Sequence, residues 1–296
     1  MNACMEAIFL RGSELGYEVW VAVAGYDGLV KDNLLRLTVS NTVGISYKSG
    51  CVFKCLRSPS FQTRDGFNKA LAVIKKHGLE ALIVLGGNGS FKGMGCLKSA
   101  GIPVIGIPAT VDNDVFYTKH NLGFSSACES AVQLIDTLKA TFETNDRDHI
   151  VQLMGRHCCE LSYTVGTATF ADIIDMEGQR HSPANAAQLI ANKRKAGKSS
   201  VYMLMQERKN VDAVAEAMDG ANYLKDLWAA TGNKDIRMNI LGHLQRGARP
   251  SCRDRFLGVV YGQAAVDCIV KKKFGIGLGY MNDQVGFVDI EPIQIP

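Results

Sequence analysis

The sequence predicts an α/β fold with two domains, each built around a parallel sheet. Apolar runs typical of buried strands alternate along the 296-residue chain with segments whose apolar residues recur at helical spacing. Strands that alternate with helices form βαβ units, in which helices cover both faces of the sheet. Ligands bind such sheets beyond the carboxyl ends of the strands, so we expect functional residues in the loops that follow the strands.

The predicted elements follow in chain order. Residues 1–15 have apolar side chains at helical spacing and stop at Gly16, and residues 18–26 have the pattern of a strand that ends in a glycine turn. Further strands are predicted over residues 80–87, 102–109, 149–155 and 199–207. The first two are continuous apolar runs, which are typical of strands buried on both faces. Helices are predicted over residues 67–79, 91–101, 125–143, 183–198, 211–232 and 255–273.

Composition argues against several classes of function. The 33 basic and 29 acidic residues leave a net charge of +4 without a basic run, which gives no support for nucleic-acid binding. No apolar run reaches the ~18 residues that a membrane span needs, and the amino-terminal residues lack the features of a signal peptide. The nine cysteines are scattered without the spacing of a zinc site, so we expect reduced thiols in a cytoplasmic protein.

The glycine turn GGNGS, residues Gly86 to Ser90, closes a predicted strand and opens a predicted helix. Glycines allow backbone N–H groups to approach a phosphate, and the amino end of a helix adds positive potential. No Gly-Lys-Ser/Thr follows, so the turn is not a Walker loop. Taken alone, it has two interpretations: a phosphate-binding loop, or a tight connection between a strand and a helix.

The acidic loop PATVDND, residues Pro108 to Asp114, follows the next predicted strand. Asp112 and Asp114 are of the residue type needed for a general base and for a ligand to a metal or a hydroxyl group. The alternative is an Asx turn, in which these side chains bond their own backbone. The glycine turn GGNGS, which suits a phosphate and follows the neighbouring strand, favours the catalytic interpretation.

Arginines supply positive charge for a polyanionic ligand. Arginine binds phosphate through a bidentate fork, so a set that converges on strand ends suits a phosphate ester. The alternative for each is a solvated surface charge, and for His243 in the segment LGHLQRG a structural role. The set comprises Arg57, Arg147, Arg156, Arg237 and Arg246. Together, the turn, the acidic loop and the arginines predict phosphoryl transfer to a hydroxyl group whose proton an acid of the loop accepts.

In these motifs the sequence resembles the ATP-dependent 6-phosphofructokinases, from Met1 to about Gln284. The matching segments are MNA at the start, GGNGS for the family's GGDGS, PATVDND for PGTIDND, MGR at 154–156, the Glu207 loop, and LGHLQRG for LGHIQRG. The resemblance implies two parallel-sheet α/β domains of phosphofructokinase type, assembled as a homotetramer that acts in glycolysis. It assigns residues 1–123 plus 245–296 to nucleotide binding and residues 124–244 to sugar-phosphate binding.

The resemblance also implies roles for matching residues. Asp112 would deprotonate the 1-hydroxyl of fructose 6-phosphate, while Thr110 and Arg156 would stabilise the transferring phosphoryl group. Asp114 would support the loop and its ion. The sugar phosphate would contact Met154, Gly155, Glu207, His243 and Arg246, with Arg147 and Arg237 supplied by a neighbouring subunit. ATP would face Tyr26, Arg57, Gly89, Ser90 and Gly93, with Mg²⁺ at Asn88.

Two small residues, Gly89 and Ala109, indicate which phosphoryl donor the resemblance implies. Members of the family that use pyrophosphate carry Asp where this sequence has Gly89, and Lys where it has Ala109. The resemblance therefore implies ATP as the donor. No nucleic acid or membrane partner is expected.

Of the departures from the family pattern, three bear most directly on fold, metal binding and regulation. The family's first strand and its GGDxPG loop precede MNA, whereas this sequence starts at Met1, so we expect the usual first strand to be lacking. Asn88 offers Mg²⁺ a neutral oxygen in place of a carboxylate. Glu6 and Leu10 replace effector-binding arginines, which gives no support for control by phosphorylated effectors. Two other hypotheses stay open: a non-catalytic sugar-phosphate-binding or partner subunit, and a kinase for pyrophosphate or another sugar.

Overall fold

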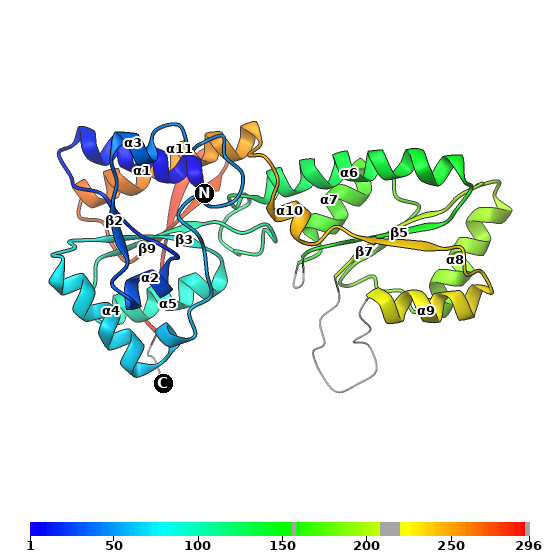
Figure 1. The fold of residues 1–296 in the computed structure, drawn as a ribbon, viewed down its shortest axis with the longest axis horizontal. Coiled ribbons are helices and arrows are strands. Elements are labelled where there is room, and N and C mark those ends of the chain that lie inside the picture. The colour runs from blue at the N-terminus through cyan, green and yellow to red at the C-terminus, as the bar shows by residue number, and fades with distance from the viewer. Residues whose placement is uncertain (156–157, 208–219, 294–296) are drawn as a thin grey trace. The chain divides into compact units, whose positions relative to one another are not determined.

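The computed structural model describes residues 1–155, 158–207 and 220–293 (Figure 1). The chain forms two compact units. Unit 1 comprises Met1–Thr110, Asp114–Gly123 and Arg249–Pro296, and unit 2 comprises Val111–Asn113 and Phe124–Ala248. Each unit contains a sheet with helices against it, so the fold is of the predicted α/β class.

The main sheet of unit 1 has four strands in the order β10-β9-β4-β3. Strands β3, β4 and β9 are parallel, and β10 pairs with β9 in the antiparallel direction. The strands span Leu82–Gly86 (β3), Val104–Pro108 (β4), Ile276–Met281 (β9) and Gln284–Asp289 (β10). The β9–β10 hairpin is absent from the sequence prediction, and it makes the sheet mixed rather than wholly parallel.

Strand β3 corrects the expectation that residues 80–87 are buried on both faces. Residues 82–85 are only half-buried, whereas every residue of β4 is buried. The reason is position in the sheet. Among the described residues, β3 has a strand neighbour only on its β4 side, so the side chains near its other side lack cover.

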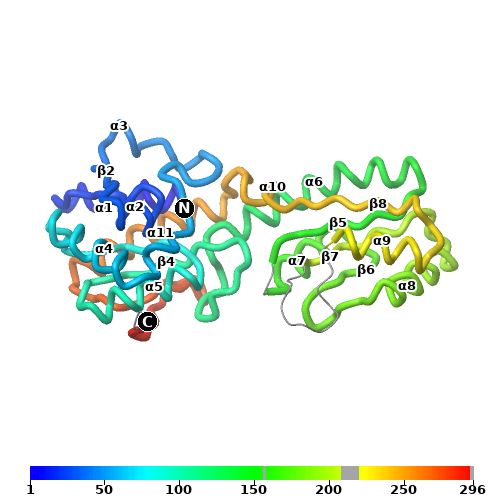
Figure 2. Tube along the Cα trace, turned by 60° about the horizontal axis from the view of Figure 1, so that its bottom comes forward, coloured from blue at the N-terminus to red at the C-terminus, as the bar shows by residue number. Residues whose placement is uncertain are grey.

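Helices cover both faces of this sheet. On one face, α1 (Asn2–Glu14) and α11 (Cys252–Val270) lie side by side (Figures 1 and 2). Gly262 permits their close approach, because a Cβ there would lie 2.7 Å from the Cys4 carbonyl oxygen. Ile105 of β4 packs with these helices, while its neighbour Val104 packs with α4 (Arg64–Lys76) and α5 (Asn88–Ser99) on the other face. This alternation is the normal consequence of the strand pleat.

Unit 1 also contains several smaller elements. The strand expected over residues 18–26 is shorter in the structure, where β1 covers only Trp20–Ala22 and Tyr26 already belongs to a helix. Strands β1 and β2 form a separate antiparallel pair. The helix α2 begins at Tyr26 and packs against α4. The elements are β1 (Trp20–Ala22), α2 (Tyr26–Val30), β2 (Leu34–Arg36), α3 (Val39–Thr42) and a 3₁₀ helix (Ser60–Gln62).

The sheet of unit 2 is wholly parallel, in the order β6-β7-β5-β8. Its strands are β5 (His149–Leu153), β6 (Ile173–Asp175), β7 (Tyr202–Gln206) and β8 (Arg237–Ile240). Figure 1 shows helices above and below it: α6 (Phe124–Thr144) and α7 (Glu160–Ala168) on one side, α8 (Pro183–Lys195) and α9 (Gly220–Thr231) on the other. The short helix α10 spans His243–Arg246. Of the helix expected over 211–232, residues 211–219 lie outside the described residues.

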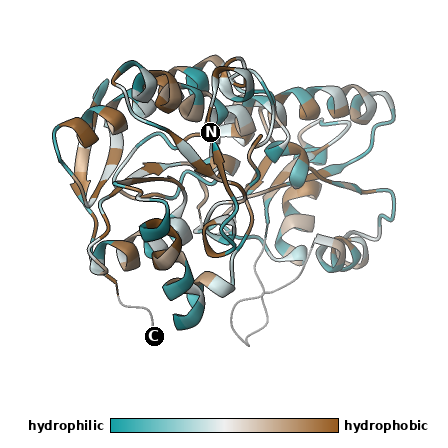
Figure 3. Cartoon of the chain, turned by 60° about the vertical axis from the view of Figure 1, so that its left-hand side comes forward, coloured by the Kyte–Doolittle hydropathy of each residue, from teal (hydrophilic) through white to brown (hydrophobic). Residues whose placement is uncertain are grey.

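Each sheet is the centre of a hydrophobic core. In unit 2, Val151 and Leu153 of β5 pack with α6 and α7, while Ile150 packs with α8 and α9. Hydrophobic and hydrophilic stretches alternate along the helices (Figure 3), as expected for helices that bury one face. Within the ranges that the structure describes, we find no helix with the length and apolar character required to cross a membrane.

Candidate functional site

The glycine turn and the acidic loop lie side by side at the carboxyl edge of the unit 1 sheet. Strands β3 and β4 are parallel and in register, with Gly86 opposite Pro108, so both strands end together. The backbone N–H of Ala109 donates to the Gly86 carbonyl (2.9 Å) and extends the pairing. A Cβ at Gly87 would lie 3.3 Å from the Thr110 Cβ, which shows how closely the two segments approach. This is the edge at which parallel sheets bind ligands.

The glycine turn leads directly into helix α5, which begins at Asn88 and has 12 residues. Glycine is required at position 86, because a Cβ there would lie 2.2 Å from Ser90 Oγ. A Cβ at Gly89 would meet nothing within 4 Å, so the space beside the first helical turn is open. The first turn of a helix carries unpaired N–H groups and partial positive charge, so this end of α5 is able to bind phosphate.

Tyr26 supports the glycine turn from helix α2. Its Oη donates to the Ser90 carbonyl (2.8 Å), and its ring stacks on Phe61 with the ring centroids 4.1 Å apart. A Cβ at Gly93 would lie 2.7 Å from the Tyr26 ring, so the packing requires glycine there. Burial raises the pKa of the Tyr26 hydroxyl above its usual value. Arg57, also expected at ATP, is exposed.

Two side-chain anchors, at Asn113 and Asp114, hold the acidic loop directly after Asp112. Asn88 Nδ2 donates to Asp114 Oδ2 (2.8 Å), which ties the loop to the first residue of α5. Asn113 is buried with a φ of 54°, and its Nδ2 donates to Glu160 Oε2 (2.7 Å) in the first turn of α7. Asp112 is half-buried beside these anchors. A general base needs this kind of support, because its carboxyl group must hold one orientation.

Asn88 and Asp114 provide oxygen atoms of the kind that Mg²⁺ prefers. The Asn88 amide nitrogen is bonded to Asp114, so its Oδ1 points away from that bond. Asp114 Oδ1 is buried and accepts no hydrogen bond from the part of the chain that the structure describes. That part contains no group of three or more His, Cys, Asp or Glu side chains able to hold a metal. A Mg²⁺ ion here would therefore keep water and phosphate oxygens as ligands, as Mg²⁺ usually does.

Unit 2 gathers five of the expected sugar-phosphate residues at the carboxyl edge of its own sheet. Leu153 of β5 pairs with Gln206 of β7, and Gln152 pairs with Ile240 of β8, so these three strands end near one another. The exposed side chains of His243 and Arg246 lie on α10, directly after β8. The full set is Met154, Gly155, Glu207, His243 and Arg246. This edge offers cationic, carboxylate and backbone groups, which suits a ligand that carries phosphate and hydroxyl groups.

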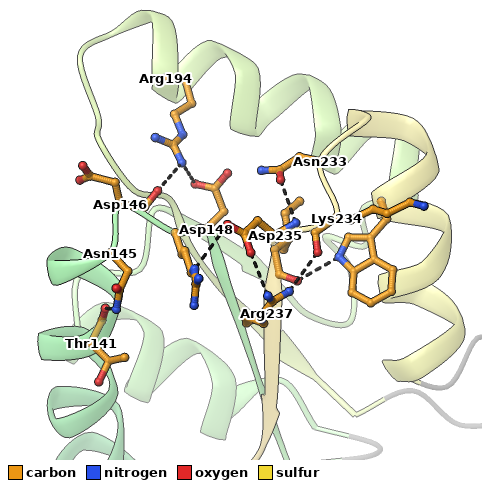
Figure 4. A network of polar contacts seen from close by, with 12 residues as sticks. Thr141, Asn145, Asp146, Asp148, Arg194, Asn233, Lys234, Asp235 and Arg237 are labelled. Carbon is orange, nitrogen blue, oxygen red and sulfur yellow. Dashed lines mark hydrogen bonds and ion pairs between the residues drawn. The ribbon is translucent and has the colours of Figure 1, made fainter.

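Arg237 lies at the opposite, amino edge of the same sheet (Figure 4), and Arg147 lies two residues before β5, which begins at that edge. Arg237 is the first residue of β8 and pairs with His149, the first residue of β5. Both arginines contact one carboxylate: Arg147 Nε is 3.4 Å from Asp235 Oδ2, and Arg237 Nη2 donates to Asp235 Oδ1 (2.8 Å). Within unit 2, these two arginines are therefore not brought together with Glu207.

Two buried glutamines at the strand ends are absent from the site residues predicted from the sequence, although Gln245 belongs to the LGHLQRG segment. Gln206 and Gln245 have 0% and 1% of their surface exposed. Gln245 Oε1 accepts a hydrogen bond from the Met154 backbone N–H (2.8 Å), which joins the segments after β5 and β8. For Gln206 the sequence did offer a signal: it is the polar residue that ends the apolar run VYMLM within SSVYMLMQE. Arg156, expected at the phosphoryl group, lies outside the described residues.

These features define a class of protein. A glycine turn at the amino end of a helix, an acidic loop beside it, and cationic side chains at the strand ends of a second sheet are typical of α/β proteins that bind phosphorylated ligands. A model of the family described as phosphofructokinase matches residues 1–269. The chain belongs to the phosphofructokinase family.

Individual relatives agree with this assignment. The ATP-dependent 6-phosphofructokinase of Finegoldia magna is 32% identical over 291 residues, which are 98% of this chain and 88% of the relative. The ATP-dependent 6-phosphofructokinase of Lactobacillus gasseri is 33% identical over 294 residues, again 98% and 88% of the two chains. The solved structure of phosphofructokinase from Pichia pastoris has a TM-score of 0.87 at 25% identity. That match covers 98% of this chain but 35% of the solved chain.

Proposed function

We propose that this protein transfers the terminal phosphoryl group of MgATP to the 1-hydroxyl of fructose 6-phosphate, forming fructose 1,6-bisphosphate and ADP in glycolysis. The observation that supports this most directly is the approach of the glycine turn to the acidic loop at one edge of the unit 1 sheet. The relatives' name, ATP-dependent 6-phosphofructokinase, supports the same reaction.

The donor phosphates bind at the glycine turn. The open space at Gly89 and the amino end of α5 support this assignment, because phosphate needs both room and unpaired N–H groups. Ser90 belongs to the first helical turn, and Tyr26 and Gly93 fix its shape. Arg57 is exposed and provides positive charge for the nucleotide.

Asp112 is the general base of the reaction. It accepts the proton of the sugar hydroxyl as the oxygen attacks the terminal phosphorus, and the bond from that phosphorus to the bridging oxygen breaks with its electron pair leaving on ADP. Thr110 and Arg156 stabilise the charge that spreads over the phosphoryl oxygens. The anchoring of Asn113 and Asp114 supports a fixed position for this base.

Unit 2 binds the acceptor. Met154, Gly155 and Glu207 line the sugar, and His243 and Arg246 bind its 6-phosphate. Arg147 and Arg237 act on the site of a neighbouring copy in a homotetramer. Their location at the amino edge, away from the other five residues, supports this division.

The residues at the glycine turn fit Mg²⁺, which Asn88 and Asp114 would hold. When bound, the ion neutralises negative charge on the donor phosphates. The protein acts in the cytoplasm, and the nine cysteines support a reducing compartment, because none of them forms a disulfide within the described structure.

The proposal is tested by incubating the purified protein with ATP, Mg²⁺ and fructose 6-phosphate and following fructose 1,6-bisphosphate by ³¹P NMR. We expect turnover by the native protein and a loss of kcat of about 10²–10⁴-fold in Asp112→Asn, since a general base contributes about that much. Calorimetric binding of fructose 6-phosphate without turnover would show a non-catalytic binding subunit. Turnover with pyrophosphate but not ATP would overturn the donor.

A further inference from the structure

One buried side chain cross-links three loops at the carboxyl edge of the unit 2 sheet. Gln206, the last residue of β7, is 0% exposed. Its Oε1 accepts from the Glu177 backbone N–H (2.7 Å), which follows β6. Its Nε2 donates to the carbonyls of Cys158 (3.2 Å) and Gly155, which follow β5. Because the strand order is β6-β7-β5-β8, one amide group joins three neighbouring strand ends.

The loop after β5 is shaped to meet this amide. Gly155 has a φ of 107°, a conformation that favours glycine, and a Cβ there would lie 3.0 Å from the Cys158 carbonyl oxygen. Gly155 and Cys158 therefore lie close together, and both of their carbonyls accept from Gln206 Nε2. A buried carbonyl that loses its donor is costly, so this loop conformation depends on the amide.

Gln206 is followed directly by Glu207, which remains paired with β5. The Glu207 backbone N–H donates to the Leu153 carbonyl (2.8 Å), so the segment after β7 stays paired with β5 one residue beyond the strand. Gln206 thus lies between two residues of the proposed sugar site, with Gly155 held by its side chain and Glu207 attached to its backbone. Its complete burial means that it acts through these neighbours and does not touch the ligand.

We infer that Gln206 is a positioning residue that holds the sugar-phosphate site in its binding conformation. The inference rests on the proposed function, because it takes Gly155 and Glu207 as residues that line fructose 6-phosphate. The nucleotide turn belongs to unit 1, whereas the side-chain hydrogen bonds of Gln206 to described residues all lie within unit 2. Loss of the amide therefore affects the affinity for the sugar phosphate selectively.

Gln206→Glu tests this with almost no change in shape. The variant keeps an acceptor for the Glu177 N–H but replaces the donor by an oxygen that faces two carbonyl oxygens. We expect the KM for fructose 6-phosphate to rise about 10- to 100-fold, and the KM for ATP to stay within about twofold.

The pH dependence separates positioning from a general loss of stability. Burial raises the pKa of a carboxyl group introduced at this position, so the group protonates as the pH falls and regains one O–H donor. The ratio of the variant KM for fructose 6-phosphate to the native KM should therefore shrink between about pH 8 and about pH 6.

Gln152→Glu is the matched control. Gln152 is also buried, with 6% of its surface exposed, but it lies within β5, and among the described residues its side chain makes no hydrogen bond to the strand-end loops. This variant should lose stability without a selective change in either KM. Gln206→Met keeps the length of the side chain without adding charge, and it serves if the first variant does not fold. It should show the same selective rise in KM without the pH dependence.

The possible outcomes distinguish failure of the positioning role of Gln206 from failure of the proposed function. A native protein that neither binds nor phosphorylates fructose 6-phosphate overturns both. A native protein that turns over, with Gln206 variants whose two KM values are unchanged or rise together, overturns the positioning role and leaves the proposed function standing.

Discussion

Asn88 Nδ2 donates a hydrogen bond of 2.8 Å to Asp114 Oδ2, and this pair joins the glycine turn to the acidic loop. The bond depends on an amide at position 88. A carboxylate there would have no donor and would repel Asp114. The family motif GGDGS, which GGNGS resembles, has a carboxylate at this position, whereas Asn88 of this chain makes a direct hydrogen bond between the two segments.

Asn88→Asp should make unit 1 dependent on a cation. Two carboxylates at this distance repel one another, so we expect the melting temperature in the presence of a chelator to fall by about 2–4 °C. Mg²⁺ should restore it by binding between the two carboxylates, because a ligand of the native state stabilises that state. Thermal unfolding with and without Mg²⁺, in the absence of nucleotide, measures both effects.

The control for this experiment is Asn88→Ala, which removes the hydrogen bond without adding charge. It should be destabilised in chelator without recovery in Mg²⁺. If Mg²⁺ raised the melting temperature of the native protein as much as that of Asn88→Asp, the amide would already be an adequate ligand and the expectation would be wrong.

Gly89→Asp should weaken ATP binding selectively. A Cβ at this position meets no atom within 4 Å, so the side chain fits sterically, but its charge lies in the first turn of α5 where the donor phosphates are expected. We expect the KM for ATP to rise about tenfold or more, since one unfavourable charge contact of ~1.4 kcal/mol corresponds to tenfold. Steady-state kinetics with each substrate varied in turn measure this, and Gly89→Asn controls for size. Equal KM values for the two variants would place the phosphates elsewhere.

His149 should make the stability of unit 2 depend on pH. Its ring is buried and stacked on Phe142, with the centroids 3.5 Å apart. Burial, with smaller contributions from the charges of Arg237 and Arg147, lowers the pKa of His149 from 6.5 to about 4. The folded state thus keeps the imidazole neutral, while the unfolded chain protonates it. This contribution is complete above about pH 6.5 and is lost as the pH falls toward about 4, to a limit of roughly 3 kcal/mol.

Urea unfolding at about pH 7.5 and about pH 5 measures this effect. His149→Gln, which carries no titratable group, should lose less stability than the native protein over the same interval. Parallel losses in the two proteins would assign the pH dependence to other groups.

Arg237 should complement Asp112 across subunits. If each site takes Asp112 from one copy and Arg237 from its neighbour, then Arg237→Ala and Asp112→Asn are each inactive alone but form whole sites when mixed. Co-expression should restore about a quarter of the native activity, because half of the pairs are mixed and each mixed pair has one whole site. Co-expression of Asp112→Asn with Thr110→Ala, whose residues share one loop, should restore none. Absence of recovery in the first pair would place Arg237 in the site of its own copy.

Local sequence patterns predicted the longer elements well. The apolar run 102–109 contains the buried strand β4, and the periodic segment 125–143 lies within α6. Short elements such as β6 and α7 have too few residues to show a period, and the sequence prediction omitted them. The hairpin of β9 and β10 had one local signal, the pair Asn282-Asp283, whose positive φ values of 51° and 59° suit a tight turn.

Sequence by itself determined which segments become strands and helices, and which polar residues follow the strands, because both depend on neighbours along the chain. Only the tertiary structure decided which strand ends share an edge. Among the described residues, it gave β3 one strand partner and left its side chains half-buried. It separated Arg147 and Arg237 from Glu207 by the length of a sheet. It brought the side chain of Gln206 to the backbone of Gly155 and Glu177. Strand order and register cause these outcomes, and they arise from packing between residues that are far apart in the chain.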